Sequence, residues 1–474
     1  FAVDKLYGPA DMLRKFIDEC HKRDIAVILD MVFNHASGLS AFAGLFWDST
    51  NNRPAANNPW MNAVAPHPYS VYNDFNHSYT ATREHFKRVL QFWLTEYKVD
   101  GYRMDLTKGL TQTTSTESTA SNYDQSRIDI LTEYYNAAKA VKPDVMFILE
   151  HFCSSTEETA LANKGMYLWR NVNNAYSQAA MGFQTSSEFS GMVASPRQWV
   201  GYAESHDEER NFFKAKTYGA SFIATDSIAR IKRVPLNIAF TTLLPGPKMV
   251  WQFGEMGYDY SINSNGGRTN EKPSAWGWLN LSHRKAAADA AAKIISLRKL
   301  YPSAFTQGTF STQVTAADWS AARRIALAHS DLNMVVLGNF TTAAVTAYPN
   351  FSKTGKWYNV LTGEELNVTN TAMSVTMQTG DLLIYTDRVV NFPSGVENTA
   401  VRNESIVFPT VTSGRLYVNT PNSVNKVAVY TLQGQLLRTE NNISQTDLSA
   451  LSSGVYLVEI SMPGRRVVAK VMKE

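Results

Sequence analysis

Short apolar runs that end at, or lead directly to, an acidic side chain recur through the first half of the chain. Runs of about 4–8 apolar residues without polar alternation are typical of strands buried on both faces. A carboxylate at the end of such a strand is costly to desolvate unless it faces a polar cleft. The acids in this pattern are Asp30, Asp105, Glu150 and Asp207. We therefore expect one polar cleft, lined by acids from several strands.

Helical segments separate these strands along the chain. Apolar residues recur at helical spacing in 11–24 and 86–97, and a third helix is expected to end near residue 140. The strands expected between the helices are 25–31, 99–105, 145–150, 166–169, 199–205 and 248–253. The alternation of helices with continuously apolar strands indicates about six parallel βα units.

Two α/β architectures fit this alternation. A (β/α)8 TIM barrel carries its chemistry on the loops that follow several of its strands. An open doubly wound sheet concentrates its site at one switch point, so acids after several strands favour the barrel. Because a complete barrel has eight strands, about six units predict an incomplete TIM barrel.

The sequence changes character near Tyr301-Pro302, where short alternating strands replace the apolar runs. These strands include 334–340 and 382–385, and we expect two small all-β sandwich domains after the barrel. The predicted domains are a catalytic barrel over 1–302 with a long loop excursion at about 36–77, a first sandwich over 303–388, a polar linker over 389–405 and a second sandwich over 406–474.

Charge and hydropathy exclude some classes of partner. The net charge of +3 provides no global field to capture nucleic acid or an anionic membrane. No apolar run approaches the length of a membrane span. The two cysteines, Cys20 and Cys153, are too few for a disulfide framework, and we expect both to be buried free thiols.

Four motifs occur in a fixed order along the predicted barrel. They are Asp-Met-Val-Phe-Asn-His at 30–35, Gly-Tyr-Arg-Met-Asp at 101–105, Phe-Ile-Leu-Glu-His at 147–151 and Ser-His-Asp at 205–207. Together they resemble the signatures of the α-amylase superfamily of glycoside hydrolases. The resemblance covers about 1–302, makes the excursion at 36–77 similar to the family's domain B, and makes the next β domain similar to the family's C-terminal sandwich. It also implies that two βα units lie upstream of Phe1.

The resemblance implies a role for three of the acids. Retaining glycoside hydrolysis needs a carboxylate nucleophile and a second carboxyl that protonates the leaving oxygen, about 5 Å apart. By resemblance, Asp105 is the nucleophile, Glu150 is the acid/base, and Asp207 holds sugar hydroxyls and stabilises the oxocarbenium-like transition state. Glu150 must be protonated at rest, so we expect burial and neighbouring carboxylates to raise its pKa. Asp30 is expected to support the fold only.

Other polar residues of the motifs are expected to bind substrate or metal. Arg103 lies two residues before Asp105 on a strand, so both side chains point to one side and the guanidinium favours the ionised carboxylate. By resemblance, His35 and His206 hydrogen-bond sugar hydroxyls, and Asn34 helps to bind a structural Ca²⁺. Asn34 could instead hydrogen-bond the backbone of the long loop.

The chain departs from the family pattern beside this calcium site. Many family members have Lys-His after the nucleophile strand, and this chain has Lys108-Gly109. A backbone carbonyl there could still serve as a calcium ligand.

A few further side chains fit either a functional or a structural role. Trp169, Trp276 and Trp278 could be platforms for sugar rings, but aromatic residues dominate cores in any case. Glu208 and Arg210 could form an ion pair that shapes the cleft, or a solvated surface pair.

Three functions remain open from the sequence. The first is a retaining α-glucan hydrolase of α-amylase type that acts on starch-like polysaccharides or oligosaccharides. The second is an α-glucan transglycosylase with branching or glucanotransferase activity, because such an enzyme shares the same catalytic acids. The third is a non-catalytic glycan-binding relative, which the presence of all three acids disfavours.

The last β unit carries a resemblance of its own. The runs 427–437, 447–449 and 453–458 resemble the C-terminal sorting domain of type IX secretion in Bacteroidetes-like bacteria. A generic β-sandwich or a carbohydrate-binding module is the alternative, but Tyr417, Tyr430 and Tyr456 are few and lie within apolar strand runs. The resemblance implies a secreted or cell-surface protein that engages the secretion machinery through this domain.

Overall fold

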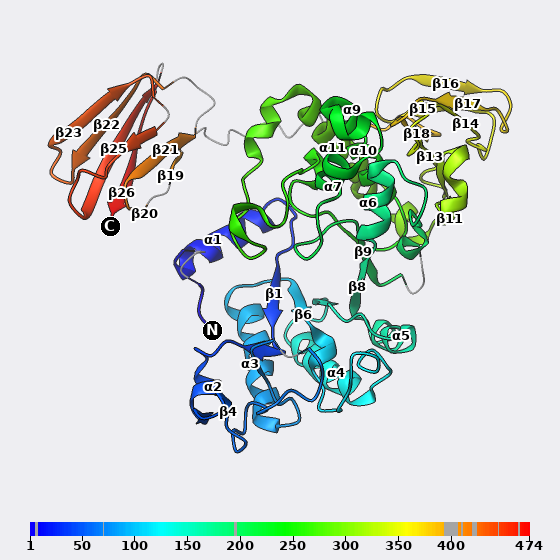
Figure 1. Ribbon diagram of the computed structural model, residues 1–474. Coiled ribbons are helices and arrows are strands. Elements are labelled where there is room, and N and C mark those ends of the chain that lie inside the picture. The colour runs from blue at the N-terminus through cyan, green and yellow to red at the C-terminus, as the bar shows by residue number, and fades with distance from the viewer. Residues whose placement is uncertain are drawn as a thin grey trace. The chain divides into compact units, whose positions relative to one another are not determined.

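The computed structural model describes residues 1–4, 8–69, 71–193, 197–392, 406–408, 411–419, 424–443, 445–462 and 465–474 (Figure 1). The chain divides into two compact units, Phe1–Val390 and Asn391–Glu474. Most of the linker expected over 389–405 lies outside the described residues. In the part of the chain that the structure describes, no helix is both long enough and apolar enough to cross a membrane.

A six-stranded, fully parallel sheet forms the centre of the first unit. Its strands pair in the order β1-β6-β7-β8-β9-β10, which is also their order along the chain. The bounds are β1 (Ile28–Val32), β6 (Gly101–Asp105), β7 (Met146–Leu149), β8 (Tyr167–Asn171), β9 (Trp199–Tyr202) and β10 (Lys248–Met249). A doubly wound sheet would reverse its strand order at a switch point. The sequential order therefore identifies a partial TIM barrel, as the sequence predicts.

Helices alternate with the strands of this sheet (Figure 1). The amphipathic segment predicted over 86–97 forms the second half of the long helix that follows the excursion, and Phe86, Leu90 and Leu94 are buried there. The helices of the first unit are α1 (Ala10–His21), α2 (Ala41–Gly44), α3 (Thr80–Glu96), α4 (Gln125–Lys139), α5 (Ser155–Asn163), α6 (Asn173–Met181), α7 (Asn211–Tyr218), α8 (Phe222–Thr225), α9 (Ser227–Ile231), α10 (Val234–Thr242), α11 (Ser282–Leu300) and α12 (Pro302–Gln307). The short 3₁₀ turns are η2 (Thr107–Gly109), η3 (Ser190–Met192), η4 (Gly254–Met256), η5 (Ser264–Gly266), η6 (Trp276–Asn280) and η7 (Ala316–Ala321).

The long excursion after β1 contains only short elements. Its strand pairs are β2 (His35–Ala36) with β5 (Asn73–Asp74), and β3 (Trp47–Asp48) with β4 (Arg53–Pro54), both antiparallel. The first pair joins the two ends of the excursion, because His35 is the register partner of Asp74. The excursion therefore leaves and rejoins the barrel at one place, next to the end of β1.

An antiparallel β-sandwich follows the barrel within the same unit. Six strands pair in the order β11-β12-β13-β18-β15-β16, and β14 pairs with β17. The bounds are β11 (Thr309–Gln313), β12 (Arg323–Ala328), β13 (Met334–Gly338), β14 (Val345–Ala347), β15 (Gly355–Asn359), β16 (Glu365–Val368), β17 (Val375–Met377) and β18 (Leu382–Thr386). Arg233 of the barrel joins the two parts, because its buried guanidinium donates to the carbonyls of Phe340 and Thr341.

The second unit is an all-β sandwich. A five-stranded sheet has the order β20-β26-β25-β22-β23, and a three-stranded sheet has the order β19-β21-β24. The bounds are β19 (Ile406–Phe408), β20 (Val411–Thr412), β21 (Arg415–Asn419), β22 (Lys426–Thr431), β23 (Leu436–Asn441), β24 (Gln445–Asp447), β25 (Gly454–Met462) and β26 (Arg465–Lys473). Leu416, Val427, Val429, Val458 and Ile460 are buried in its core, at the alternate positions expected of strands in a sandwich.

Candidate active site

Arg103 is the hub of the polar side chains at the carboxyl end of the sheet. Its Nη1 lies 2.8 Å from Asp30 Oδ1 and 2.8 Å from Asp105 Oδ1, and its Nη2 lies 2.8 Å from Glu150 Oε2. The strand register produces this contact, because Asp30 of β1 pairs with Arg103 of β6, and Arg103 pairs with Ile148 of β7. One guanidinium, with only 7% of its side chain exposed, thus joins acids from three neighbouring strands.

The three carboxylates differ in their access to solvent. The exposed fraction of the side chain is 57% for Asp30, 22% for Asp105 and 12% for Glu150. Burial raises the pKa of Glu150 above its usual 4.5; Arg103 and the Leu106 N–H oppose this shift, and the Asp105 carboxyl adds to it. Glu150 is the most buried of the three acids, and its raised pKa favours retention of a proton compared with a free glutamate. The predicted direction for Glu150 agrees with the structure.

The backbone after β6 holds the Glu150 side chain and main chain. The Leu106 N–H donates to Glu150 Oε2 at 2.9 Å, and the Thr107 N–H donates to the Glu150 carbonyl at 2.9 Å. Leu106 adopts a left-handed conformation with φ 44°, which is uncommon for a residue other than glycine. The turn after Asp105 therefore aims two backbone donors at Glu150, at some conformational cost.

Asp207 lies in the loop after β9 with 31% of its side chain exposed. Its backbone N–H donates to Ser205 Oγ, its Oδ1 lies 3.4 Å from His206 Nε2, and Arg268 forms an ion pair with the same oxygen. Arg268 comes from the polar loop that follows β10. A single arginine in a Gly- and Asn-rich loop carries no sequence signal for a partner 61 positions away, so the sequence reasoning missed it.

Aromatic rings connect the Asp207 loop to Arg103. The ring of Trp169 in β8 packs against the Arg103 guanidinium, with its centroid 4.1 Å from Arg103 Cζ. The centroids of the Trp169 and His206 rings are 6.2 Å apart. Trp251, which the sequence reasoning also missed, lies 5.8 Å from His206. Burial, with Arg103 adding to its effect, lowers the pKa of His206, so its imidazole is neutral at neutral pH. Trp169 is only 5% exposed, which supports its packing role over a role as a sugar platform.

Asn34 and His35 follow the carboxyl end of β1. Burial lowers the pKa of His35, and its Nδ1 lies 3.3 Å from Asn34 Nδ2. The His35 ring lies 6.0 Å from that of Tyr72, a residue of the excursion. The structure therefore brings Arg103, Asp105 and Glu150 into direct contact, joins His206 and Asp207 to them through Trp169, and places His35 where the excursion begins.

Asn34 fits one part of a calcium site. It is fully buried, and its Oδ1 has no hydrogen-bond partner. A Cβ added to Gly109 would overlap this oxygen, so any larger residue there would have to displace the Asn34 amide. Among the described residues, the one group of three or more His, Cys, Asp or Glu ligand atoms is His151, Cys153 and Glu157, so calcium at Asn34 would need amide or backbone oxygens beside any carboxylate. The calcium site stays a prediction.

The prediction that Glu208 pairs with Arg210 is wrong. Arg210 Nη2 binds Glu204 Oε2 at 2.9 Å, and Glu204 Oε1 accepts the Asn211 N–H at the start of α7. Glu204 is favoured because it lies buried at the positive end of a helix, where a carboxylate is stabilised. Glu208 contacts Ser205 and Asn171 instead.

The expected surroundings of some other residues also differ. The thiols of Cys20 and Cys153 are free, as predicted, but both residues are only partly buried. Trp276 is 64% exposed, whereas Trp278 packs under the Arg284 guanidinium at 3.7 Å. No described contact joins Trp276 or Trp278 to Arg103 or its acids.

Two families match the chain. The family of α-amylase catalytic domains matches residues 1–78 and 67–276, and the secretion-system C-terminal sorting domain matches residues 406–474. The second match identifies the β19–β26 sandwich as a type IX sorting domain, which marks the protein as secreted or held at the cell surface.

Individual relatives are distant. A cyclomaltodextrinase from Geobacillus thermopakistaniensis is 22% identical over 406 residues, which cover 81% of this chain and 63% of that protein. Alpha-amylase 3 from Dictyoglomus thermophilum is 27% identical over 160 residues, 30% of each chain. The chain spans less than two thirds of the length of these curated relatives.

Solved structures share the fold. An Anoxybacillus α-amylase superposes with a TM-score of 0.59 at 15% identity, covering 81% of each chain. Eubacterium rectale Amy13B superposes with a TM-score of 0.60 at 17% identity, covering 82% of this chain and 84% of that one. At these identities the likeness concerns the fold alone. The family match over more than half of the chain, on a partial barrel, identifies the chain as a member of the α-amylase family of glycoside hydrolases.

Proposed function

We propose that the first unit carries the site of a retaining α-glucan hydrolase of α-amylase type, acting on starch-like polysaccharides or oligosaccharides in the full-length protein. The observation that carries the proposal is the contact of Arg103 with both Asp105 and Glu150 at 2.8 Å. Double-displacement hydrolysis requires one carboxylate that can attack and a second carboxyl that keeps a proton. Here one cation contacts both carboxyls, and Asp105 is the more exposed of the two.

In the first step, Asp105 attacks the anomeric carbon and forms a glycosyl ester as the glycosidic bond breaks. Glu150 gives its proton to the departing oxygen, which leaves as a sugar hydroxyl. Arg103 Nη1 donates to Asp105 Oδ1 at 2.8 Å and holds the attacking carboxylate in place. The Leu106 N–H, bound to Glu150 Oε2, fixes the carboxyl that delivers the proton.

In the second step, Glu150 takes a proton from water, and the resulting oxygen nucleophile attacks the anomeric carbon and releases Asp105. Asp207 stabilises the positive charge that develops on the sugar in both steps. The neutral imidazoles of His35 and His206 donate or accept hydrogen bonds at sugar hydroxyls. For Asp207 to bind a sugar, its ion pair with Arg268 must open or admit the hydroxyls beside it.

The nucleophile is tested by Asp105→Asn in the full-length protein, with Asp30→Asn as the matched control. Both substitutions turn a carboxylate on Arg103 into an amide. We expect Asp105→Asn to reduce kcat on maltooligosaccharides by about 10⁴-fold or more. Asp30→Asn should reduce it far less, because Asp30 is proposed only to support Arg103. Turnover retained by Asp105→Asn would refute the assignment.

Product analysis on starch, pullulan and maltooligosaccharides then separates hydrolysis from transglycosylation. The same acids serve both reactions, which differ in whether water or a sugar hydroxyl resolves the glycosyl ester. Release of reducing ends without longer or newly branched products supports hydrolysis. Products longer than the substrate would assign the site to the transglycosylase alternative, and lack of any turnover would favour the non-catalytic relative.

A further inference from the structure

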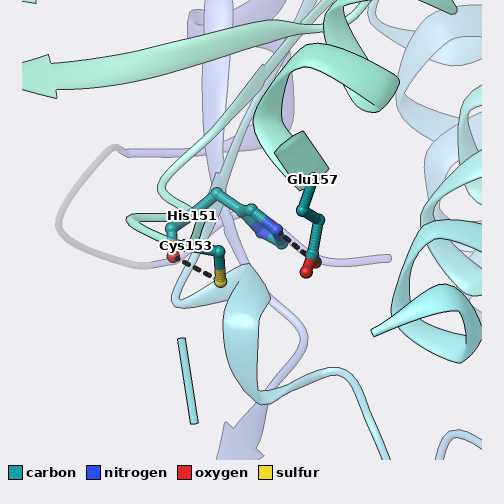
Figure 2. A group of neighbouring side chains, drawn as sticks. All are labelled: His151, Cys153 and Glu157. Atoms are coloured by element: carbon teal, nitrogen blue, oxygen red, sulfur yellow. Dashed lines mark hydrogen bonds and ion pairs between the residues drawn. The ribbon is translucent and has the colours of Figure 1, made fainter. Parts of the chain in front are cut away.

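A second polar cluster lies behind Glu150, on the loop after β7 and the first turn of α5. Figure 2 shows His151, Cys153 and Glu157 together, with the His151 ring directed at the Glu157 carboxylate. One ligand atom from each lies within 4.8 Å of the others, and these ligand types suit zinc. The cluster therefore needs either a metal or a complete set of partners inside the protein.

The partners of the cluster are protein groups. Arg127 binds the Glu157 carboxylate through both oxygens, Nε to Oε1 at 2.7 Å and Nη2 to Oε2 at 2.8 Å. His151 Nε2 lies 2.7 Å from the same Oε1, and the Cys153 thiol donates to the His151 carbonyl at 3.4 Å. Burial raises the pKa of Cys153 to about 12, so it stays a thiol. A cation here would have to displace a guanidinium, which argues against a metal site.

Arg127 is completely satisfied although it is buried. Besides the two bonds to Glu157, its Nη1 donates to the carbonyls of Lys108 and Ala120, and its Nη2 donates to that of Asn122. These bonds use all five N–H groups of the guanidinium. Arg127 comes from the first turn of α4 and Glu157 from the first turn of α5, so their pair joins the loop after β6 to the loop after β7.

The cluster continues through Thr107 to Glu150. His151 Nδ1 lies 3.0 Å from Thr107 Oγ1, which also lies 2.8 Å from the Glu150 carbonyl oxygen. Thr107 directly follows Leu106, whose N–H holds the Glu150 carboxyl. We call the chain Arg127–Glu157–His151–Thr107 the buried relay. It fixes the main chain on both sides of the hydrogen bond that aims Glu150.

We propose that Arg127, Glu157, His151 and Thr107 are positioning residues for the acid/base Glu150. The proposal rests on the proposed function, because it assumes that Glu150 delivers the proton. Buried ion pairs add little net stability compared with apolar packing, so their use here is better explained by geometry. The side chains of Glu157 and His151 are both fully buried, and a buried network of polar partners favours one arrangement.

The test exploits the leaving group. A sugar leaving group needs protonation by Glu150, whereas fluoride departs with little acid assistance. In the full-length protein, Glu157→Gln keeps the side-chain shape but turns an NH₂ group toward Arg127 or His151. We expect kcat/KM on maltoheptaose to fall about 10²-fold, the loss expected from a misplacement of about 1 Å. The value on α-maltosyl fluoride should change little.

Asp387→Asn is the matched control. Asp387 is also a buried carboxylate, 1% exposed, paired with Lys353 at 2.8 Å, but it belongs to the sandwich end of the unit. It should lower stability without selective loss on maltoheptaose. If Glu157→Gln does not fold, Thr107→Val provides the second variant, because it removes only the hydroxyl between His151 and Glu150. It should give the same selective loss, smaller in size.

The outcomes separate the two proposals. If Glu150→Gln itself shows no selective loss on maltoheptaose, Glu150 is not the acid/base and the proposed function fails. A different outcome is that Glu150→Gln shows the selective loss while Glu157→Gln and Thr107→Val lower kcat/KM equally on both substrates, or on neither. In that case the relay only supports the fold and the inference is overturned. Selective loss in all three variants supports it.

Discussion

Replacement of Arg103 by glutamine is expected to have a stability cost that depends on pH. The substitution removes one positive charge from among three carboxylates and keeps a polar side chain of similar length. Asp30 is 57% exposed, so water replaces most of the interaction that it loses with Arg103. An exposed ion pair contributes only about 0–1 kcal/mol. Asp105 and Glu150 are 22% and 12% exposed, and they bear most of the change.

The size of the effect follows from these two acids. Removing one partner of a buried ion pair costs about 3–5 kcal/mol when the other partner stays charged. Proton uptake by Glu150 limits this cost, because each unit of pKa shift corresponds to about 1.4 kcal/mol. We therefore expect the free energy of unfolding of the first unit to fall by about 3 kcal/mol at neutral pH.

The sign of the pH dependence comes from Glu150. Burial raises its pKa, so ionisation of Glu150 costs folding free energy as the pH rises above its usual pKa of 4.5. Arg103 lowers that pKa and so reduces the cost. Without Arg103 the cost is larger, so the variant should lose most stability at neutral and alkaline pH. The part of the loss that comes from Glu150 should disappear as the pH falls toward 4.5, where protonation of Glu150 is favoured in both proteins, while the lost contacts with Asp105 and Asp30 remain.

Tryptophan fluorescence during urea unfolding measures this unit alone, because all ten tryptophans lie within Phe1–Val390. Arg103→Lys is the matched control. It keeps the charge but not the fork that reaches several acids, and it should lose less stability, with a weaker pH dependence. An equal loss for Arg103→Gln at pH 5 and pH 8, or no loss, would refute the account of the carboxylate cluster.

Three other predictions concern the same end of the barrel. Glu150→Gln should reduce kcat on maltooligosaccharides by about 10²–10⁴-fold and remove the basic limb of the pH–rate profile; a persisting limb would assign it to another group. Gly109→Ala should lower the midpoint of the tryptophan-monitored thermal transition, because the new Cβ overlaps the buried Asn34 amide; an unchanged midpoint would contradict the close contact. If Asn34 binds calcium, a chelator should lower the same midpoint in the wild type but not in Asn34→Ala, and an equal response would place the metal elsewhere.

Periodicity was sufficient to predict the strands and the acids that follow them. Arg103 and Asp105 share a side because strand side chains alternate, so their contact could be predicted from spacing alone. The contacts of Arg103 with Asp30 and Glu150 depend on the register between strands, which spacing within one strand cannot provide. The bounds shifted by a few residues at β1, where the apolar run begins before the first ladder pair at Ile28.

Contacts between loops could not be predicted. Arg210 binds Glu204 rather than Glu208 because the Glu204 carboxylate is held at the start of α7, where it accepts the Asn211 N–H. Proximity in the sequence gives no information about that helix end. Arg268 reaches Asp207 from a polar loop without periodicity. The relay residue Arg127 resembles any surface arginine at a helix start until its five acceptors, contributed by the loop after β6 and by α5, are known.

Asp105 is proposed to attack the sugar while Glu150 supplies the proton. Glu150→Gln in the full-length protein, treated with α-maltosyl fluoride, should form the glycosyl ester and hydrolyse it slowly, because the base for the second step is missing. Mass spectrometry of the digested protein should then find one maltosyl group on the peptide that contains Asp105. A maltosyl group on another residue, or rapid turnover of the fluoride to a product of inverted configuration, would contradict the account.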